Sequence, residues 1–275
     1  MTYTFSQITS YLESIAPLNF QESYDNSGLL VGNPNTEVTG ILVSLDTIES
    51  VIEEAKAKNC NLIVAHHPII FRGLKSLTGK NYIERTVIKA IQEGIGIYAI
   101  HTNLDNSQDG VNAKIAKKIG LINTKILSPK NNVFYKINDD ETQKVGSGMI
   151  GQLSEAISVQ AFLANLKSKM NLPLIKHTSL ENFKGKKIKK MAICGGAGSF
   201  LLSEAIKQEA DFFITGDYKY HEFFDAENKI VICDIGHYES EVFTKDLLVD
   251  FLKEKFSNIE IIACQTNTNP VEYYF

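Results

Sequence analysis

Two adjacent histidines, His66 and His67, stand directly after the apolar run of residues 62–65 and directly before Pro68. A short, continuous apolar run is typical of a strand buried on both faces, and a proline cannot donate a hydrogen bond to a neighbouring strand. The two imidazoles should therefore lie at the carboxyl end of a strand, where open α/β sheets bind their ligands. They could bind a metal or take part in catalysis, or they could be two polar residues that close a strand.

Five of the six histidines follow predicted strands, and acidic residues accompany three strand ends. The histidines are His66, His67, His101, His221 and His237, and the acids are Asp105, Asp217 and Glu241. His237 and Glu241 are four residues apart, so a helix beginning near them would present both on one face. Imidazoles and carboxylates are ligands of divalent transition metals. The set is too large for one tetrahedral ion, so we expect two ions that share a carboxylate.

Alternating strands and helices must position these residues. Apolar runs predict strands at residues 40–45, 62–65, 95–100, 188–194, 211–215, 230–233 and 259–264. Helical spacing and capping signals predict helices from residue 5 to about 15, through 51–55, 83–91, 111–119 and 199–208, and through 242–251. Asp46, followed three residues later by Glu49, is expected to cap the second helix. The alternation predicts an α/β fold with mostly parallel sheets and right-handed crossovers.

A change in composition near residue 128 predicts a domain boundary, because Pro129-Lys130-Asn131-Asn132 and the polar segment of residues 138–144 follow it. Beyond it the first pattern returns at a shift of 150 residues, with Glu54-Ala55 matching Glu204-Ala205. Any two β-α-β units could share such a pattern, but we interpret it as a duplication. We expect one domain over residues 1–128 with 235–275, carrying most of the metal ligands, and a second over residues 129–234.

Composition excludes several classes of function. The chain has 275 residues, 44% of them apolar and 22% charged, which is ordinary for one large or two smaller globular domains. A net charge of -4 gives no electrostatic footprint for nucleic acid or an anionic membrane. No basic-then-apolar leader and no apolar run of about 18 residues occurs, so we expect a cytoplasmic protein. The four cysteines include no Cys-x-x-Cys pair and are expected to be buried thiols.

Five motifs, in this order along the chain, resemble the Nif-three-like family, whose members are also labelled GTP cyclohydrolase 1 type 2 homologues. They are Ala65-His66-His67-Pro68, His101-Thr102-Asn103-Leu104-Asp105, Gly195-Gly196-Ala197-Gly198, Thr215-Gly216-Asp217 with Tyr220-His221, and Gly236-His237 with Ser240-Glu241. The resemblance covers nearly the whole chain, from Tyr24-Asp25-Asn26 to Asn269-Pro270. Tyr24 replaces a tryptophan common in the family, and the length leaves no room for the middle domain that some members carry.

The resemblance implies two related α/β domains with mostly parallel or mixed sheets, a dinuclear metal site between them, and a toroidal homohexamer. The ligands it implies are His66, His67, Asp105, His237 and Glu241. In the family pattern Glu241 bridges both ions, His67 and Asp105 bind one ion, and His66 and His237 bind the other. Imidazole-rich sites favour Fe, Mn, Zn, Co or Ni over Mg or Ca.

Other residues have two readings each. His101 could be a ligand, although we expect it to hold a ligand or the site by a hydrogen bond. His221 could donate a proton or complete a turn. Arg72 is one of only two arginines and lies just past the two histidines, where an arginine could bind a phosphate. Alternatively, the rarity of arginine reflects a lysine-rich composition. The amides of Gly195–Gly198 could hold an anion, but close packing is the favoured reading.

Two classes of function remain. In the first, the chain is a two-metal hydrolase acting on a nucleotide or related phosphorylated small molecule. The family label points to GTP, although the sequence contains no guanine-reading motif. In the second, the chain is a non-catalytic metal-binding scaffold or regulatory hexamer. An open coordination position would favour hydrolysis, and full protein coordination would favour the scaffold.

Overall fold

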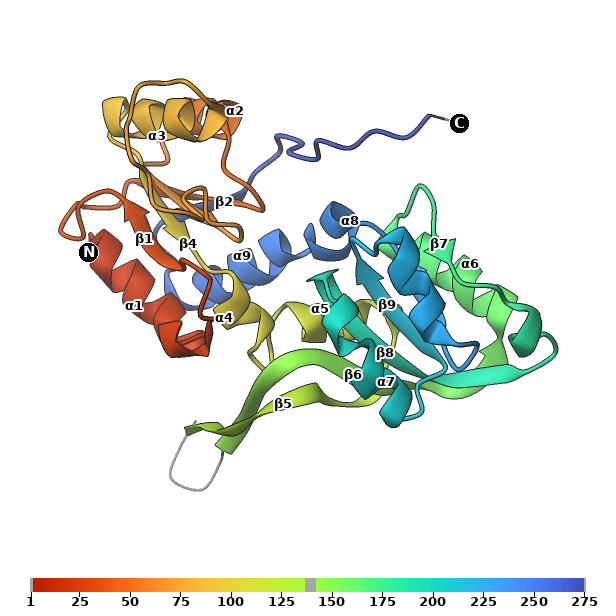
Figure 1. Cartoon of the computed structure of the whole chain (residues 1–275). Coiled ribbons are helices and arrows are strands. Elements are labelled where there is room, and N and C mark those ends of the chain that lie inside the picture. Colours follow the sequence, from red (N-terminus) through yellow and green to blue (C-terminus); the bar gives the residue numbers. More distant parts are fainter. Residues whose placement is uncertain (1, 137–141, 275) are drawn as a thin grey trace. The chain divides into compact units, whose positions relative to one another are not determined.

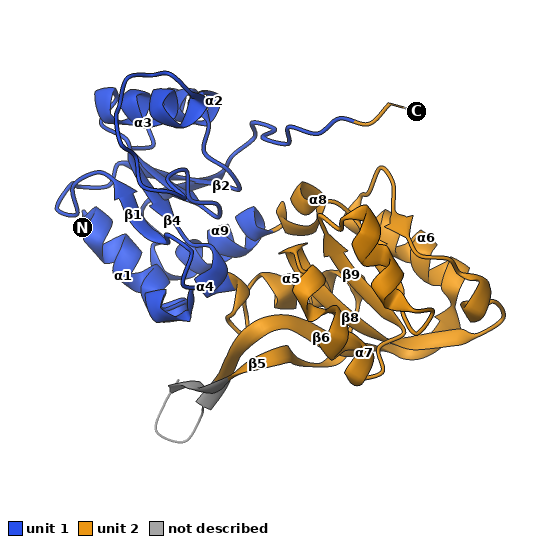
Figure 2. Ribbon diagram, viewed as in Figure 1, with its two compact units in different colours: residues 1–104, 244–272 blue, residues 105–243, 273–275 orange. Residues whose placement is uncertain are grey.

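The chain forms two compact units, coloured separately in Figure 2. The computed structural model describes residues 2–136 and 142–274, apart from the side chains of residues 131–143, so much of the polar 138–144 stretch lies outside the described residues. Unit 1 comprises residues 1–104 and 244–272, and unit 2 comprises residues 105–243 and 273–275. The units divide at residues 104 and 243, whereas the domain limits expected from the sequence, at 128 and 234, both lie within unit 2.

Unit 1 is built on a five-stranded sheet of order β1-β4-β3-β2-β11. Its strands are β1 (Gly28–Val31), β2 (Gly40–Ser44), β3 (Leu62–Ala65), β4 (Gly96–Ala99) and β11 (Glu260–Ala263). All neighbours run parallel except β1, which is antiparallel to β4. The four parallel strands were predicted from their apolar runs. β1 was not, because it is half-buried and lies in a segment that the sequence presents as a loop.

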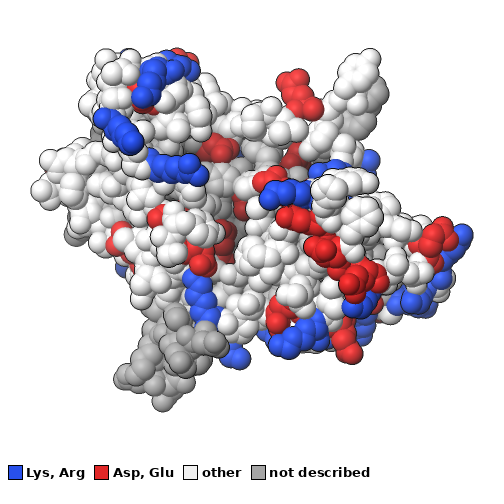
Figure 3. Space-filling view, viewed as in Figure 1, with Lys and Arg blue, Asp and Glu red and all other residues white. Residues whose placement is uncertain are grey.

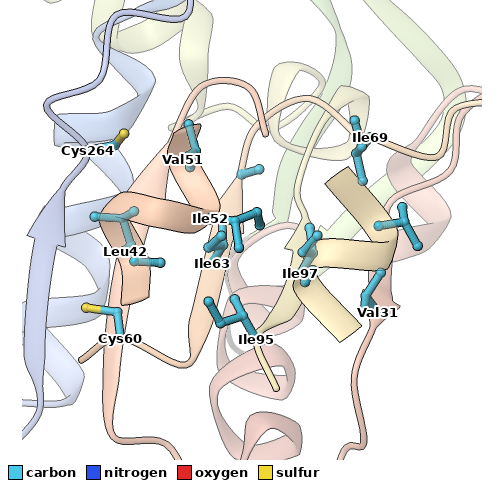
Figure 4. Packing of buried hydrophobic residues seen from close by; sticks show 14 residues of the cluster. Val31, Leu42, Val51, Ile52, Cys60, Ile63, Ile69, Ile95, Ile97 and Cys264 are labelled. Carbon is cyan, nitrogen blue, oxygen red and sulfur yellow. The ribbon is translucent and has the colours of Figure 1, made fainter. Parts of the chain in front are cut away.

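Helices cover both faces of this sheet (Figure 1). α2 (Glu49–Ala57) and α3 (Tyr82–Gln92) lie on one face, and α1 (Phe5–Ile15) and α9 (Thr244–Lys255) lie on the other. Figure 4 shows the packing on the α2 side, where Val51 and Ile52 meet the strand residues Leu42, Ile63 and Ile97. These five side chains are fully buried, so the strand ends that carry the histidines rest on a rigid core.

One predicted cap is wrong. α2 begins after Ile48, and no side chain caps it. Asp46 lies two residues earlier, and its carboxylate contacts His67 and Thr268 instead. Asp46 thus contacts a side chain at the end of a neighbouring strand instead of capping α2. In contrast, the predicted capping box of α1, formed by Thr4 and Gln7, is confirmed.

Unit 2 contains a six-stranded mixed sheet of order β5-β6-β8-β9-β10-β7. Its strands are β5 (Ile122–Lys136), β6 (Thr142–Ser158), β7 (Lys176–His177), β8 (Lys187–Ala197), β9 (Phe212–Gly216) and β10 (Val231–Asp234). Its α-helices are α5 (Val111–Ile119), α6 (Val159–Met170), α7 (Leu202–Lys207) and α8 (His237–Glu241), and a 3-10 segment, η4, spans Tyr220–Ala226. The sequence did not predict the β5/β6 hairpin, because the hairpin is polar. The helix expected through residues 242–251 is α9, which is separate from α8.

The predicted duplication agrees with the strand registers. In unit 1, Ile41 of β2 pairs with Leu62 of β3, and in unit 2, Met191 of β8 pairs with Phe212 of β9, each 150 residues later. Both sheets continue with a third parallel strand, β4 or β10, and both then add a short antiparallel edge strand, β1 or β7. The α/β class predicted from the sequence is confirmed, and corresponding strand ends in the two units are equivalent positions for ligands.

The charged surface, the helices and the cysteines agree with what the composition predicts. On the face seen in Figure 3, acidic and basic side chains are interspersed. None of the described helices combines the length and apolarity that a membrane crossing requires. The four cysteines are buried and free, as expected: Cys60, Cys194, Cys233 and Cys264.

Candidate metal centre

Unit 1 brings three imidazoles together at the carboxyl ends of two adjacent parallel strands. His66 and His67 follow β3, and His101 follows β4. Their ring centroids lie 4.9 to 5.4 Å apart, and one nitrogen from each ring lies within 4.8 Å of the others. His66 is fully buried, and the other two are partly exposed. Such a cluster is compatible with metal binding.

Each of these rings is held through Nδ1. The Nδ1 atom of His66 lies 2.8 Å from the carbonyl oxygen of Ile100, and that of His67 lies 2.7 Å from Oδ1 of Asp46. The Nδ1 atom of His101 lies 2.7 Å from Oδ1 of Asp25. A carbonyl or an ionised carboxylate can only accept a hydrogen bond, so Nδ1 must carry the proton. Nε2 is then the lone-pair donor, the arrangement that orients metal-binding histidines.

Several hydrogen bonds hold the carboxylate of Asp25, including the one from His101. Burial raises the pKa of the Asp25 carboxyl, but hydrogen bonds from His101, Thr102 and the Asn26 amide outweigh this and hold the pKa well below its usual range. Asp25 is therefore ionised at neutral pH and fixes the His101 tautomer. Sequence reasoning assigned no role to Asp25, because it lies in a loop 76 residues from His101.

A second acidic partner links the C-terminal segment to the centre. Oδ2 of Asp46 accepts a hydrogen bond from Oγ1 of Thr268 at 2.6 Å, while Oδ1 faces His67. The chain just before Thr268 is held by Glu54, which accepts hydrogen bonds from Gln265 and Thr266. Asp46 follows β2, the strand beside β3, so its position alone could have indicated a contact with His67. The sequence instead led us to predict that Asp46 caps a helix.

Unit 2 carries a matching pair in α8. Nε2 of His237 lies 3.0 Å from Oε2 of Glu241, so the predicted four-residue spacing does place both side chains on one helix face. Nδ1 of His237 lies 2.7 Å from Oδ2 of Asp217, which follows β9. Glu241 is 3% exposed. This ring is thus held by a carboxylate in the same way as His67 and His101.

Gly196 in β8 packs directly against this pair. A Cβ atom at Gly196 would clash with Oε1 of Glu241 and would lie 3.3 Å from Cε1 of His237. Its backbone φ is +62°, which favours glycine. Its amide donates to Oγ of Ser240, and its carbonyl accepts from Oγ1 of Thr215. These contacts agree with close packing, the reading that the sequence favoured for the glycine-rich turn.

Asp105 is the first residue of unit 2 and the last of α4 (Thr102–Asp105), the short helix after β4. Its carbonyl accepts a hydrogen bond from Asn112. Burial, together with the nearby carboxylates of Asp105 and Glu241, raises the pKa of the Cys194 thiol well above its usual range. Two of the predicted acidic ligands therefore lie close to one buried cysteine that stays protonated.

The remaining candidates lie elsewhere. His221 is exposed in η4 with its ring 5.2 Å from that of Tyr220, and Arg72 is exposed in the loop after Pro68. Within the part of the chain that the structure describes, neither His221 nor His177 joins a group of three potential ligands. His101 does join one, beside His66 and His67. Its ring therefore lies within reach of the same site as theirs.

Comparisons with known proteins agree with one another. A GTP cyclohydrolase 1 type 2 homolog of Clostridium acetobutylicum is 31% identical over 278 residues, covering 99% of this chain and 100% of the relative. One from Staphylococcus aureus is 28% identical over 366 aligned positions that cover 98% of this chain and 99% of the relative. That relative carries residues this chain lacks, so this chain has the short form.

Solved structures give the same answer. The crystal structure of a Bacillus cereus protein related to NIF3 matches with a TM-score of 0.89 and 25% identity over 99% of each chain. A family model, Duf34/NIF3, matches residues 3–270. The chain therefore belongs to the Duf34/NIF3 (NGG1p interacting factor 3) family.

Proposed function

We propose that this chain binds two divalent metal ions and uses them to hydrolyse a nucleotide or a related phosphorylated small molecule. The proposed ligands are His66 and His67 of unit 1 with Asp105, His237 and Glu241 of unit 2. The observation that carries the proposal is the state of the rings: His66, His67 and His237 each have Nδ1 held by an oxygen. A ring held at Nδ1 in this way is oriented with its Nε2 available to a metal, as metal-binding histidines are.

The donor set fits such ions. Imidazoles and carboxylates suit Fe, Mn, Zn, Co and Ni, and a carboxylate such as Glu241 can balance the charge of two cations. When bound, ions of this kind activate water and polarise the bond that is attacked. His101 is our candidate for receiving the proton of that water, because Asp25 holds its Nδ1 and so directs Nε2 away from that contact. Arg72 and His221, both exposed, are candidates for contacting the substrate.

The substrate class rests on the relatives. Those from Clostridium acetobutylicum and Staphylococcus aureus are named as GTP cyclohydrolase 1 type 2 homologs, so hydrolytic opening of a purine nucleotide is the first reaction to test. We extend the name to this chain only as a proposal. A self-assembled homohexamer is also proposed, on the family resemblance and on the dominance of closed point groups among soluble oligomers.

The test is metal analysis followed by a substrate screen. Protein purified without chelator, or reconstituted with each metal, should contain about two ions per chain by elemental analysis. The loaded protein is then incubated with GTP, other nucleotides and phosphoesters, with a His67→Gln variant as control. Turnover by the parent protein alone supports the hydrolase. Two bound ions without turnover of any compound would favour the scaffold, and less than about half an ion per chain would refute the metal centre.

A further inference from the structure

A pocket of about 530 Å³ lies in unit 1 beside His67. This volume is in the range that holds a nucleoside-sized molecule. The polar and aromatic residues that matter for recognition are Asp46, Thr47, His67, Tyr82, Asn267 and Asn269. Two isoleucines and two prolines make up the apolar part of its lining.

The buried hydroxyl of Thr47 is the first feature of this pocket that points to a bound ligand. Thr47 is 3% exposed, and among the described residues its Oγ1 has no hydrogen-bond partner. Buried hydroxyls are rarely left in this state, because the lost hydration is not replaced. A ligand in the pocket that Thr47 lines could supply the missing hydrogen bond.

Tyr82 and Asn267 add a flat surface and an amide. Tyr82 begins α3, and more than half of its surface is exposed, so its ring has a free face beside the pocket. The carboxamide oxygen of Asn267 accepts a hydrogen bond from the Asn269 amide at 3.1 Å. The other end of that carboxamide carries two N–H donors, which suit carbonyl and ring-nitrogen acceptors.

The charge of the pocket limits what it can hold. Of the described residues that line it, none is a lysine or arginine. The one carboxylate, Asp46, already accepts hydrogen bonds from His67 and Thr268. A phosphate would lose its hydration here and meet no cation. The pocket therefore suits an uncharged group with hydrogen-bonding edges and an aromatic face.

We infer that this pocket binds the heterocyclic base of the substrate, a planar, uncharged ring that stacks on Tyr82 and hydrogen-bonds to Thr47 and Asn267. The base then lies next to His67, one of the proposed metal ligands. The inference deepens the proposed function and rests on it for the role of His67. Binding of the base itself requires only residues of unit 1.

A single indole can report occupancy, because the chain contains no tryptophan. The Tyr82→Trp variant is titrated with guanosine, adenosine and ribose 5-phosphate. We expect saturable quenching by the two nucleosides, since a stacked base quenches indole, and none by ribose 5-phosphate. The matched control is Phe200→Trp, which places an exposed indole in unit 2. Its fluorescence should not change beyond the inner-filter correction.

Equilibrium dialysis of the unmodified chain with the same nucleosides gives a second measurement. Thr47→Val removes the hydroxyl at constant shape and should weaken binding about fivefold, as for one neutral hydrogen bond. Tyr82→Ala should weaken binding roughly tenfold by removing the stacking surface. Unchanged affinity in both variants, equal quenching in the Phe200→Trp control, equal binding of ribose 5-phosphate, or no nucleoside binding by the unmodified chain would each overturn the inference.

Failure of this inference can be told apart from failure of the proposed function. Nucleoside binding is measured on chelator-treated protein as well as on metal-loaded protein, and metal content is measured separately. Nucleoside binding in a chain that takes up no metal supports the pocket and refutes the metal centre. Two bound metals with no nucleoside binding refute the pocket alone.

Discussion

The carboxylate of Asp46 accepts a hydrogen bond from Nδ1 of His67 at 2.7 Å and so fixes the tautomer of that ring. Its second oxygen is held by Thr268, in the segment that follows β11 and 222 residues after Asp46 in the sequence. His67, at the end of β3, is thereby coupled to the C-terminal segment. Side chains that hold a metal-binding histidine in this way are worth roughly 10- to 100-fold in metal affinity.

Thr268→Val should lower metal affinity without unfolding unit 1. The valine keeps the shape but removes the hydrogen bond that orients Asp46, so we expect a loss of about three- to tenfold. Thr268→Ser, which retains a hydroxyl, is the matched control and should stay within about twofold of the parent. Calorimetric titration with Zn²⁺ or Mn²⁺ measures both. Equal affinity in the valine and serine variants would show that Thr268 has no orienting role.

Glu241→Gln should leave the fold intact and remove at least one metal ion. The amide has the same shape, but without the charge of Glu241 the repulsion between the two cations would be offset less. His177→Gln, on the exposed edge strand β7, should retain the full metal content. Elemental analysis of both variants provides the test, and two full-affinity ions in the Glu241 variant would mean that this residue does not bridge them.

Gly196→Ala should weaken metal binding because its methyl group would push Glu241 out of place. The substitution also costs about 1 kcal/mol for an alanine at positive φ. Gly185→Ala separates the two effects, since Gly185 has φ +74° and a Cβ atom there would meet no other atom within 4 Å. Both variants should lose similar stability in urea, whereas only Gly196→Ala should lose metal in the titration. Equal metal affinity in the two would remove Gly196 from the centre.

Glu54→Gln should destabilise unit 1 in a pH-dependent way. Burial raises the pKa of Glu54, but hydrogen bonds from Thr266, Gln265 and Cys264 lower it to about 2. A depressed folded-state pKa stabilises above the unfolded value of about 4.3, and that contribution is lost as the pH falls toward about 2. We expect a deficit of about 1–2 kcal/mol at neutral pH that shrinks as the pH falls from about 5 toward about 2.

Urea unfolding at several pH values measures the deficit of the Glu54 variant. Glu53→Gln is the control, because Glu53 is exposed on the same helix and forms an ion pair with Lys89. Such exposed pairs contribute less than about 1 kcal/mol. A deficit for Glu54→Gln that does not change with pH would show that its charge is not what holds residues 264–266.

The chain should assemble as a closed homohexamer. This expectation follows from the family resemblance and from the prevalence of closed point groups. Light scattering at micromolar concentration should give about six times the 30.6 kDa chain mass. A monomeric mass under these conditions would refute the assembly.

Local signals in the sequence determined the parallel strands and the positions of the histidines. Buried strands such as β3 and β4 read as uninterrupted apolar runs, and a histidine after such a run must lie at the strand end. The spacing of His237 and Glu241 placed both on one helix face, because a helix repeats about every 3.6 residues. The matching strand registers of the two units were likewise indicated by a constant shift of 150 residues.

Only the tertiary structure decided which carboxylates hold the rings. Asp25 reaches His101 across 76 residues, and Asp46 contacts His67 although its spacing to Glu49 is that of a helix cap. Sequence spacing cannot distinguish these roles, since a carboxylate after a strand can bond to a backbone amide or to a distant side chain. The packing of Gly196 against Glu241 and the pocket beside His67 also depend on segments brought together by folding. Local patterns encode elements and their faces, whereas the partners of a polar side chain are chosen by the fold.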